Sequence, residues 1–203
     1  MEELFVTEDL NISKILEELR AVGTASVRIL DEDFRISLLE EAQYYSYEPE
    51  EEVVGSGERL VKQQVFSFKD FPDESGYILL KDSFEELFNR HLEGVEPYPF
   101  ETPLNFNSMV LQKYEKESIG ITPHKDGKSY INVVCIFVIG GKGRFFICSD
   151  RAGNDSREID ASEGNLILMR APGFYGSEND RPFHYVTDIK ERRYSFGVRQ
   201  KRV

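Results

Sequence analysis

The chain is 203 residues long, 40% of them hydrophobic and 12% aromatic, which suits one domain with a sizeable core and excludes global disorder. Its net charge of −12 argues against a protein whose whole surface binds nucleic acid. The charge is uneven, because residues 1–100 carry 9 basic and 24 acidic side chains, whereas residues 101–203 carry 16 basic and 13 acidic ones. We therefore predict a single domain over residues 1–203, with residues 1–100 as a flank that includes a candidate substrate lid and residues 101–203 as the core.

No apolar run approaches the length of a membrane span, and the longest, residues 131–139, has the length of a strand. Residues 1–3 lack the basic start of a signal peptide. We therefore expect a soluble, cytoplasmic protein with no membrane partner. The two cysteines do not make a disulfide framework. If residues 140–143 form a hairpin loop, Cys135 lies opposite Cys148, and the two form either a cross-strand disulfide or a pair of reduced, half-buried thiols.

In the first half, leucines and isoleucines at helical spacing, bounded by polar caps and glycines, predict three helices. Asp31 is a typical N-cap, and Asp82 followed by Glu85 resembles a capping box. His91 falls in the last turn of the third helix, where a partly cationic imidazole suits the helix dipole, so we assign it a structural role. The predicted elements are a helix between Thr7 and Gly23, a strand at 24–30, a helix at 31–45, a strand at 60–68 and a helix at 82–94.

Beyond residue 100 the pattern changes to short β-branched and aromatic runs separated by Gly, Asn, Asp or Pro turns. Seven or eight short strands in about a hundred residues favour a closed sandwich or barrel, for which a jelly roll is a common solution. The predicted fold class is therefore α+β, with a jelly-roll core and flanking N-terminal helices. The predicted strands are 108–115, 129–139, 143–148, 157–159, 165–169, 183–188 and 193–200.

Two of the three histidines frame the most informative part of the chain. His124 and Asp126 are two residues apart in a predicted strand, so both side chains point to one face, and Pro123 and Gly127 place them at a strand end. His184 lies 60 residues further on. Two imidazoles and one carboxylate on one side of a metal form the facial triad of non-haem Fe(II) oxygenases, which leaves open positions for a co-substrate and O₂. Zinc accepts the same three ligands.

The last predicted strand supplies a candidate co-substrate site. Alternation places Arg193, Ser195, Gly197 and Arg199 on one face and the apolar residues of the strand on the other. The two arginines lie ~20 Å apart along an extended strand, and the small residues between them leave a hollow. Two long side chains leaning inward would bracket a short dicarboxylate. A surface strand with solvated arginines is the alternative.

Other polar residues offer further contacts. Gln112 and Tyr114 alternate on the strand that leads to the first histidine, and the tyrosine either donates a hydrogen bond to a carboxylate or simply packs. The loop 171–182 is long enough to line the substrate entrance. Three arginines on or beside the predicted hairpin that follows residue 143 either meet an anionic substrate or form a solvated edge. They are Arg144, Arg151 and Arg157.

Residues 107–202 resemble the Fe(II)- and 2-oxoglutarate-dependent dioxygenases, and within them the AlkB-like branch. The resemblance rests on the segments LQKYEKESIGITPHKDG, RPFHYV and RYSFGVRQ, the last with two arginines six residues apart. It implies a double-stranded β-helix core with Fe(II) on the two histidines and the aspartate named above. It also implies 2-oxoglutarate with its distal carboxylate on Arg193, assisted by Tyr114, and with Arg199 and Gln112 at the end near the metal. Ser195 is a further co-substrate contact, although the branch more often has asparagine there and at Gln112.

The resemblance implies oxidative decarboxylation of 2-oxoglutarate to succinate, coupled to hydroxylation of a C–H bond; a hydroxylated N-methyl group then leaves as formaldehyde. Many nucleic-acid demethylases of the branch stack a flipped base on aromatic side chains, and this chain has no tryptophan, although Tyr, Phe or His can substitute. The substrate is a nucleic acid, a small molecule or a protein side chain. The alternative from another class is a non-catalytic jelly-roll protein that keeps a metal or a dicarboxylate.

Overall fold

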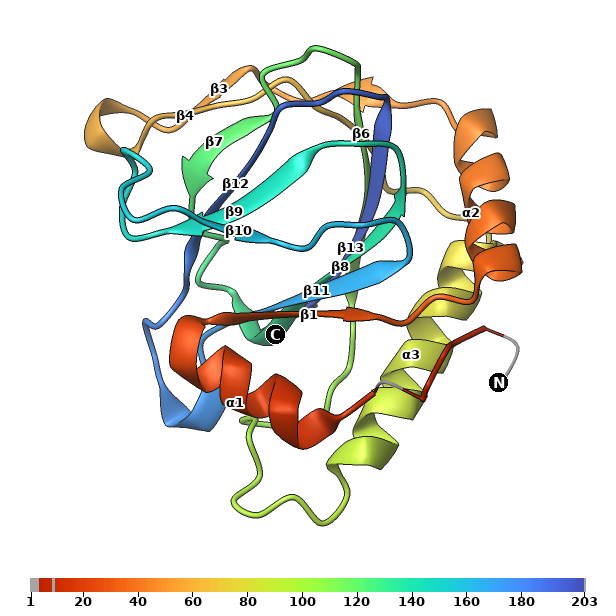
Figure 1. Ribbon diagram of the computed structural model, residues 1–203, viewed down its shortest axis with the longest axis vertical. Helices are drawn as coiled ribbons and strands as arrows, with labels where there is room; N and C mark the ends of the chain where they lie inside the picture. Colours follow the sequence, from red (N-terminus) through yellow and green to blue (C-terminus); the bar gives the residue numbers. More distant parts are fainter. Residues whose placement is uncertain (1–3, 9, 203) are drawn as a thin grey trace.

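The computed structural model describes residues 4–8 and 10–202 and folds them into two facing antiparallel sheets with three helices outside them (Figure 1). The large sheet has the strand order β1-β11-β8-β13-β6-β5-β2, the small sheet has the order β10-β9-β12-β7, and β3 pairs with β4 alone. This is the predicted α+β jelly roll, or double-stranded β-helix. The elements are α1 (Ile12–Val22), β1 (Thr24–Arg28), α2 (Glu32–Tyr44), β2 (Glu48–Pro49), β3 (Val53–Val54), η1 (Gly57–Arg59), β4 (Val61–Lys62), β5 (Phe66–Phe68), α3 (Gly76–Leu92), β6 (Ser108–Tyr114), β7 (Ile121–His124), β8 (Tyr130–Gly140), β9 (Arg144–Cys148), β10 (Arg157–Ile159), β11 (Asn165–Arg170), η2 (Phe174–Gly176), β12 (Phe183–Thr187) and β13 (Arg193–Lys201).

The alternation of side chains along the central strand β8 creates two cores. Its odd-numbered residues 133–139 pack with the helices on the outer face of the large sheet. Its even-numbered residues 134–138 pack between the two sheets, against the apolar side chains of β7, β9 and β12. Because successive strand residues point to opposite faces, a continuous apolar run is what a strand covered on both sides requires.

The first hundred residues do more than flank the core. β1 extends one edge of the large sheet by pairing with β11, and β5 and β2 extend the other edge beyond β6. Asp31 caps α2 as predicted, because its Oδ1 accepts the backbone N–H groups of Asp33 and Phe34. Helix α1 ends at Gly23 as predicted, but it begins at the Asn11 cap.

The capping box predicted at Asp82 is wrong. Helix α3 begins two turns earlier, where the hydroxyl of Ser75 accepts the backbone N–H of Tyr77 and a carboxylate oxygen of Glu41 accepts that of Gly76. Tyr77 is fully buried, so the apolar stripe of the helix already faces the core before Asp82 is reached. The predicted strand at 60–68 is likewise divided into β4 and β5.

The predicted hairpin between β8 and β9 is also wrong, because these strands belong to different sheets. Cys135 pairs with Leu168 and Val198 in the large sheet, and Cys148 pairs with Phe183 in the small one, so both cysteines are free. The loop between the strands carries the chain from one sheet to the other. Gly141 turns there with φ +80°, and a Cβ atom at this position would lie 1.8 Å from the carbonyl oxygen of Arg192.

In the part of the chain that is described, none of the helices has both the length and the apolar character to cross a bilayer. Residues 1–3, on which the expectation of no signal peptide rests, lie outside the described residues.

Candidate metal and co-substrate site

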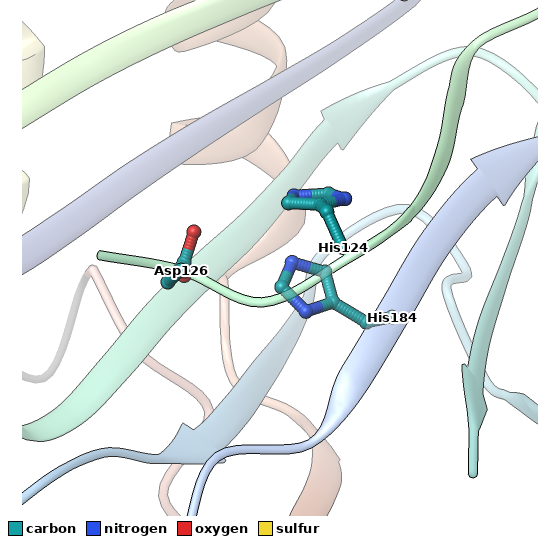
Figure 2. Close-up of side chains that lie close together, drawn as sticks. All are labelled: His124, Asp126 and His184. Carbon is teal, nitrogen blue, oxygen red and sulfur yellow. The ribbon is translucent and has the colours of Figure 1, made fainter. Parts of the chain in front are cut away.

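His124, Asp126 and His184 come together between the two sheets, with one ligand atom of each lying within 4.8 Å of the others. His124 is the last residue of β7, and the register of the small sheet sets it directly opposite His184 of β12. The prediction that Asp126 lies in the same strand is wrong, because β7 ends at His124 and Asp126 follows it in a loop. Figure 2 shows the three side chains turned toward one another, and the two imidazole centroids are 4.2 Å apart.

The backbone fixes which imidazole nitrogen is available. The Nδ1 atom of His124 is 3.0 Å from the carbonyl oxygen of Thr122, and that of His184 is 3.5 Å from the carbonyl oxygen of Pro182. A neutral imidazole that donates from Nδ1 keeps its Nε2 lone pair for a metal. The ring of Phe145 stacks on His184 at 5.7 Å and holds its orientation.

Burial sets the protonation state of the triad. It lowers the pKa of His184 to about 3, helped by His124 and opposed by Asp126. Burial also lowers the pKa of His124. For Asp126, burial alone would raise the pKa, but the positive charge of Arg199 and those of the two imidazoles bring it below its usual value. Since both imidazoles are neutral near pH 7, Arg199 and, with a smaller effect, Arg181 are the cations that keep this carboxyl ionised there. Two neutral imidazoles and a carboxylate are the donor set that Fe(II) takes.

The two arginines of β13 point into the same space, whereas Tyr194, Phe196 and Val198 face the helices. Arg193 is 1% exposed, and its Nε and Nη2 atoms are buried without a hydrogen-bond partner. Burial lowers the pKa of its guanidinium. The Nε atom of Arg199 is also buried and unpartnered, 4.0 Å from Asp126 Oδ2.

These groups, which lack hydrogen-bond partners, fit the ligands that the fold implies. Buried charges are costly unless they are paired, and here two guanidinium groups and the unpartnered Asp126 Oδ2 atom face one cavity of about 330 Å³. A divalent metal would satisfy the carboxylate, and a dicarboxylate would satisfy the arginines. Gly197 leaves the space that Arg199 occupies, since a Cβ atom there would lie 3.0 Å from its Nη1 atom.

The predicted contacts of β6 line the same cavity. Gln112 lies opposite Ser195 and Tyr114 opposite Arg193 in the register of the large sheet. The guanidinium of Arg193 lies over the Tyr114 ring, 5.8 Å from its centroid. Burial raises the pKa of Tyr114 to about 12, although Arg193 and Arg199 oppose it, so the hydroxyl remains a donor at neutral pH.

The cavity entrance differs from the prediction. Loop 171–182 does not line this cavity; its Phe174 side chain packs in the outer core instead. The β3–β4 hairpin and Gln63 line the cavity instead, and among the three arginines only Arg151 does so. Arg144 forms an exposed ion pair with Glu158.

Several lining residues were not predicted, because they lie on strands or in the segments after them, whose approach to the cavity depends on the packing of the two sheets. The alternation of β9 and β12 indicates that their inward side chains are apolar, but not which cavity they border. The unpredicted lining residues are Val54, Val61, Gln63, Ile121, Lys125, Ile136, Phe145 and Val186.

No protein-family model and no curated protein sequence matches the chain. Solved structures do match it. A prolyl hydroxylase from Trichoplax adhaerens, in complex with a hypoxia inducible factor oxygen degradation domain peptide fragment, is 15% identical with a TM-score of 0.68, over 93% of this chain and 88% of that one. HygX from Streptomyces hygroscopicus, with nickel, 2-oxoglutarate and hygromycin B bound, is 10% identical with a TM-score of 0.64, over 95% and 88%. OsALKBH1 is 13% identical with a TM-score of 0.60, over 88% and 98%.

At these identities the likeness is one of fold, and it extends over nearly the whole chain, including the helices and strands of the first hundred residues. The chain therefore has the double-stranded β-helix fold of the 2-oxoglutarate–Fe(II) oxygenases.

Proposed function

We propose that the protein is an Fe(II)- and 2-oxoglutarate-dependent oxygenase. The observation that carries the proposal is the convergence of His124, Asp126 and His184 on a cavity that also holds two buried guanidinium groups whose Nε atoms have no hydrogen-bond partner. A fold gains nothing from burying such cations alone, and a metal with a dicarboxylate beside it accounts for all of them at once.

Each residue has a distinct role in this proposal. The two histidines and Asp126 would hold Fe(II), and Arg193 would bind the distal carboxylate of 2-oxoglutarate, with Tyr114 donating to it. Arg199, which faces Asp126, would serve the end of 2-oxoglutarate near the metal. The remaining co-substrate contacts would come from Gln112 and Ser195, which lie side by side in the sheet.

When bound, Fe(II) would supply the redox chemistry by which 2-oxoglutarate, O₂ and a substrate C–H group become succinate, CO₂ and a C–OH group. The chain prepares the site for this reaction. It keeps both imidazoles unprotonated by burial. It also surrounds them with the apolar side chains of Ile136, Phe145 and Val186, which limit the access of water to the reacting groups.

The finer prediction, AlkB-like N-demethylation of a nucleic acid, is one of three substrate classes within this proposal. OsALKBH1 shares the fold, but so do a prolyl hydroxylase and HygX at similar TM-scores. Oxygenation of a small molecule or of a protein side chain is therefore equally compatible with the fold. A jelly-roll protein that binds a metal and a dicarboxylate without turnover is the alternative from another class.

Succinate formation separates an enzyme from such a binding protein. Metal-depleted protein is reloaded with Fe(II) and incubated with 2-oxoglutarate under air, and succinate is measured; we expect slow turnover even without substrate. His184→Ala should abolish it, whereas His91→Ala should not, because His91 lies in α3 with its Nδ1 atom 2.9 Å from the carbonyl oxygen of Leu87. Wild-type protein that binds iron and 2-oxoglutarate but releases no succinate would establish the non-catalytic alternative.

Binding to single-stranded DNA or RNA, measured against salt concentration, tests the nucleic-acid class. Phosphate contacts release counterions, so a true nucleic-acid enzyme loses affinity steeply as salt rises. No binding at low salt would exclude this class and leave the other two.

A further inference from the structure

Two cations border the cavity without belonging to the proposed metal or co-substrate sites. Lys125 lies between the two ligands contributed by the β7 end, and Arg151 comes from the loop between β9 and β10. Within residues 4–8 and 10–202, neither side chain forms a salt bridge, and the Nη1 atom of Arg151 is buried with no hydrogen-bond partner. Both are half-buried cations that the fold leaves unpaired.

The β9–β10 loop is built to hold Arg151 in place. The carboxylate of Asp150 accepts the backbone N–H groups of Ala152 and Asn154 at 2.9 and 3.1 Å and the side-chain amide of Asn154 at 2.7 Å. The carbonyl oxygen of Asp150 accepts the thiol of Cys148. Such side-chain to backbone bonds fix a turn, so Arg151 projects from a rigid base.

A shared aromatic ring fixes the two cations relative to the triad. Lys125 Nζ lies 4.5 Å, and the Arg151 guanidinium 5.6 Å, from the centroid of Phe183. Phe183 directly precedes the metal-site residue His184 on β12. The two cations therefore lie over one ring, next to a residue of the triad.

This cationic pair is separate from the proposed 2-oxoglutarate site. The side chain of Arg193 lies beside Gly143, the residue that precedes β9: a Cβ atom added to Gly143 would be 3.0 Å from the Cδ atom of Arg193. Arg151 follows the end of β9, and five residues of strand span about 13 Å. The Arg193 and Arg151 guanidinium groups therefore lie near opposite ends of β9. One short dicarboxylate cannot pair with both of them.

We infer that the substrate of the proposed oxygenase is a small molecule bearing a carboxylate or phosphate group, which Arg151 and Lys125 hold above Phe183 and beside the triad. The inference rests on the proposed function. It places the anionic group of the substrate over Phe183 and leaves the neighbouring C–H bond to face the three metal ligands.

The surroundings favour one compact anion over a polymer. A nucleic acid needs several phosphate contacts, and the two arginines near Lys125 other than Arg151 already have partners within the chain. Arg170 pairs with Asp180, and Arg181 donates to the carbonyl oxygen of Asp126. The net charge of −12 would further repel a polyanion.

Two aromatic anions test the site: benzoate for the carboxylate and phenyl phosphate for the phosphate, with benzyl alcohol as the uncharged control. Binding is measured by calorimetry to protein carrying Ni(II) and 2-oxoglutarate, and to metal-free protein. We expect Arg151→Gln to weaken binding of at least one anion by on the order of 10- to 100-fold, as loss of a charge-assisted hydrogen bond does. Arg151→Lys should recover part of the affinity.

Matched controls come from the same segments. Arg157→Gln removes an exposed arginine of β10, and Lys128→Gln removes an exposed lysine three residues beyond Lys125; both should leave anion binding unchanged. The inference is overturned if neither anion binds the wild type, or if Arg157→Gln weakens binding as much as Arg151→Gln. Tight oligonucleotide binding that depends equally on both arginines would overturn it in favour of a polymer.

The two proposals fail separately. If 2-oxoglutarate does not bind with Ni(II), the proposed function falls, while the Arg151-dependent binding of anions to metal-free protein still decides whether the anion site exists. If Arg151→Gln binds 2-oxoglutarate and forms succinate like the wild type but shows no loss of anion affinity, only the present inference falls.

Discussion

Replacing Arg193 with methionine should make the ligand-free protein more stable and nearly unable to bind 2-oxoglutarate. The side chain is 1% exposed, and two of its three nitrogens lack partners. Burying an unpaired cation costs several kcal/mol after relaxation, and apolar replacements of buried charges often stabilise by about 1–4 kcal/mol. For a chain of about 200 residues, each kcal/mol corresponds to roughly 2–4 °C in the midpoint of thermal unfolding.

The loss of binding follows from the same atoms. If 2-oxoglutarate accepts two charge-assisted hydrogen bonds from Arg193, each worth about 1.5–3 kcal/mol, Arg193→Met should raise its Kd by roughly 10²- to 10⁴-fold. At a concentration of 100 times Kd, a ligand stabilises the folded state by about 2.7 kcal/mol. The wild type should therefore gain stability with 2-oxoglutarate and Ni(II), whereas Arg193→Met should not, even though it starts from a higher value.

The assay is urea or thermal unfolding with and without the ligands, and Arg192→Met is the matched control. Arg192 is the neighbouring residue, but its side chain is 57% exposed in an ion pair with Glu115, and such surface pairs contribute about 0–1 kcal/mol. It should leave both stability and ligand response nearly unchanged. A loss of more than about 2 kcal/mol in ligand-free Arg193→Met would mean that the guanidinium serves the fold, and an unchanged Kd would move the co-substrate role to another residue.

Three further predictions concern protonation, packing and the thiols. The pKa of His184 is about 3 in the folded chain against 6.5 in the unfolded chain, so the free energy of unfolding falls as pH drops below 6.5. About 2 kcal/mol should be lost between pH 6.5 and 5, and this loss should vanish in His184→Gln. The same pH dependence of the free energy of unfolding in both proteins, measured with urea, would contradict this. Gly197→Ala should displace the Arg199 guanidinium, 3.0 Å from the added methyl group, and raise the 2-oxoglutarate KM at least several-fold without unfolding the protein, as followed by succinate formation and circular dichroism. Cys135 and Cys148 should both react with a thiol reagent in denatured, non-reduced protein, and detection of one thiol or none would show a disulfide that the sheet topology forbids.

The parts of the site that could be predicted from the sequence obey a local rule. A strand turns alternate side chains to one face, so the sequence RYSFGVRQ alone separates Arg193 and Arg199 from the apolar residues between them, and β13 has that arrangement. The same rule holds for Gln112 and Tyr114 on β6. It holds because both faces of these strands are committed, one to the helices and the other to the cavity.

The wrong predictions have a common cause. In each case the local sequence is compatible with two structures, and tertiary packing determines which one forms. A Gly-rich loop serves a hairpin or a crossing between sheets equally well, and the closure of the jelly roll selected the crossing between β8 and β9. Ser75 and Asp82 are both competent caps, and the burial of Tyr77 decided for Ser75. Arg151 was one of three similar arginines, and the Asp150 turn selected it.

The cavity is where the chain departs furthest from what stability alone would choose. Apolar residues at Arg193 and Arg199 would pack between the sheets as Ile136 and Val138 do on the neighbouring strand. Instead the fold buries two like-charged guanidinium groups in one cavity and leaves some of their N–H donors without acceptors. This arrangement destabilises the ligand-free protein, unlike the consistent packing expected of a chain selected for stability alone. Such a cost is retained when a ligand removes it, so the unpaired donors themselves describe that ligand. Under the proposed function, that ligand would carry negative charge at both ends of the β13 face, with a metal beside one of them.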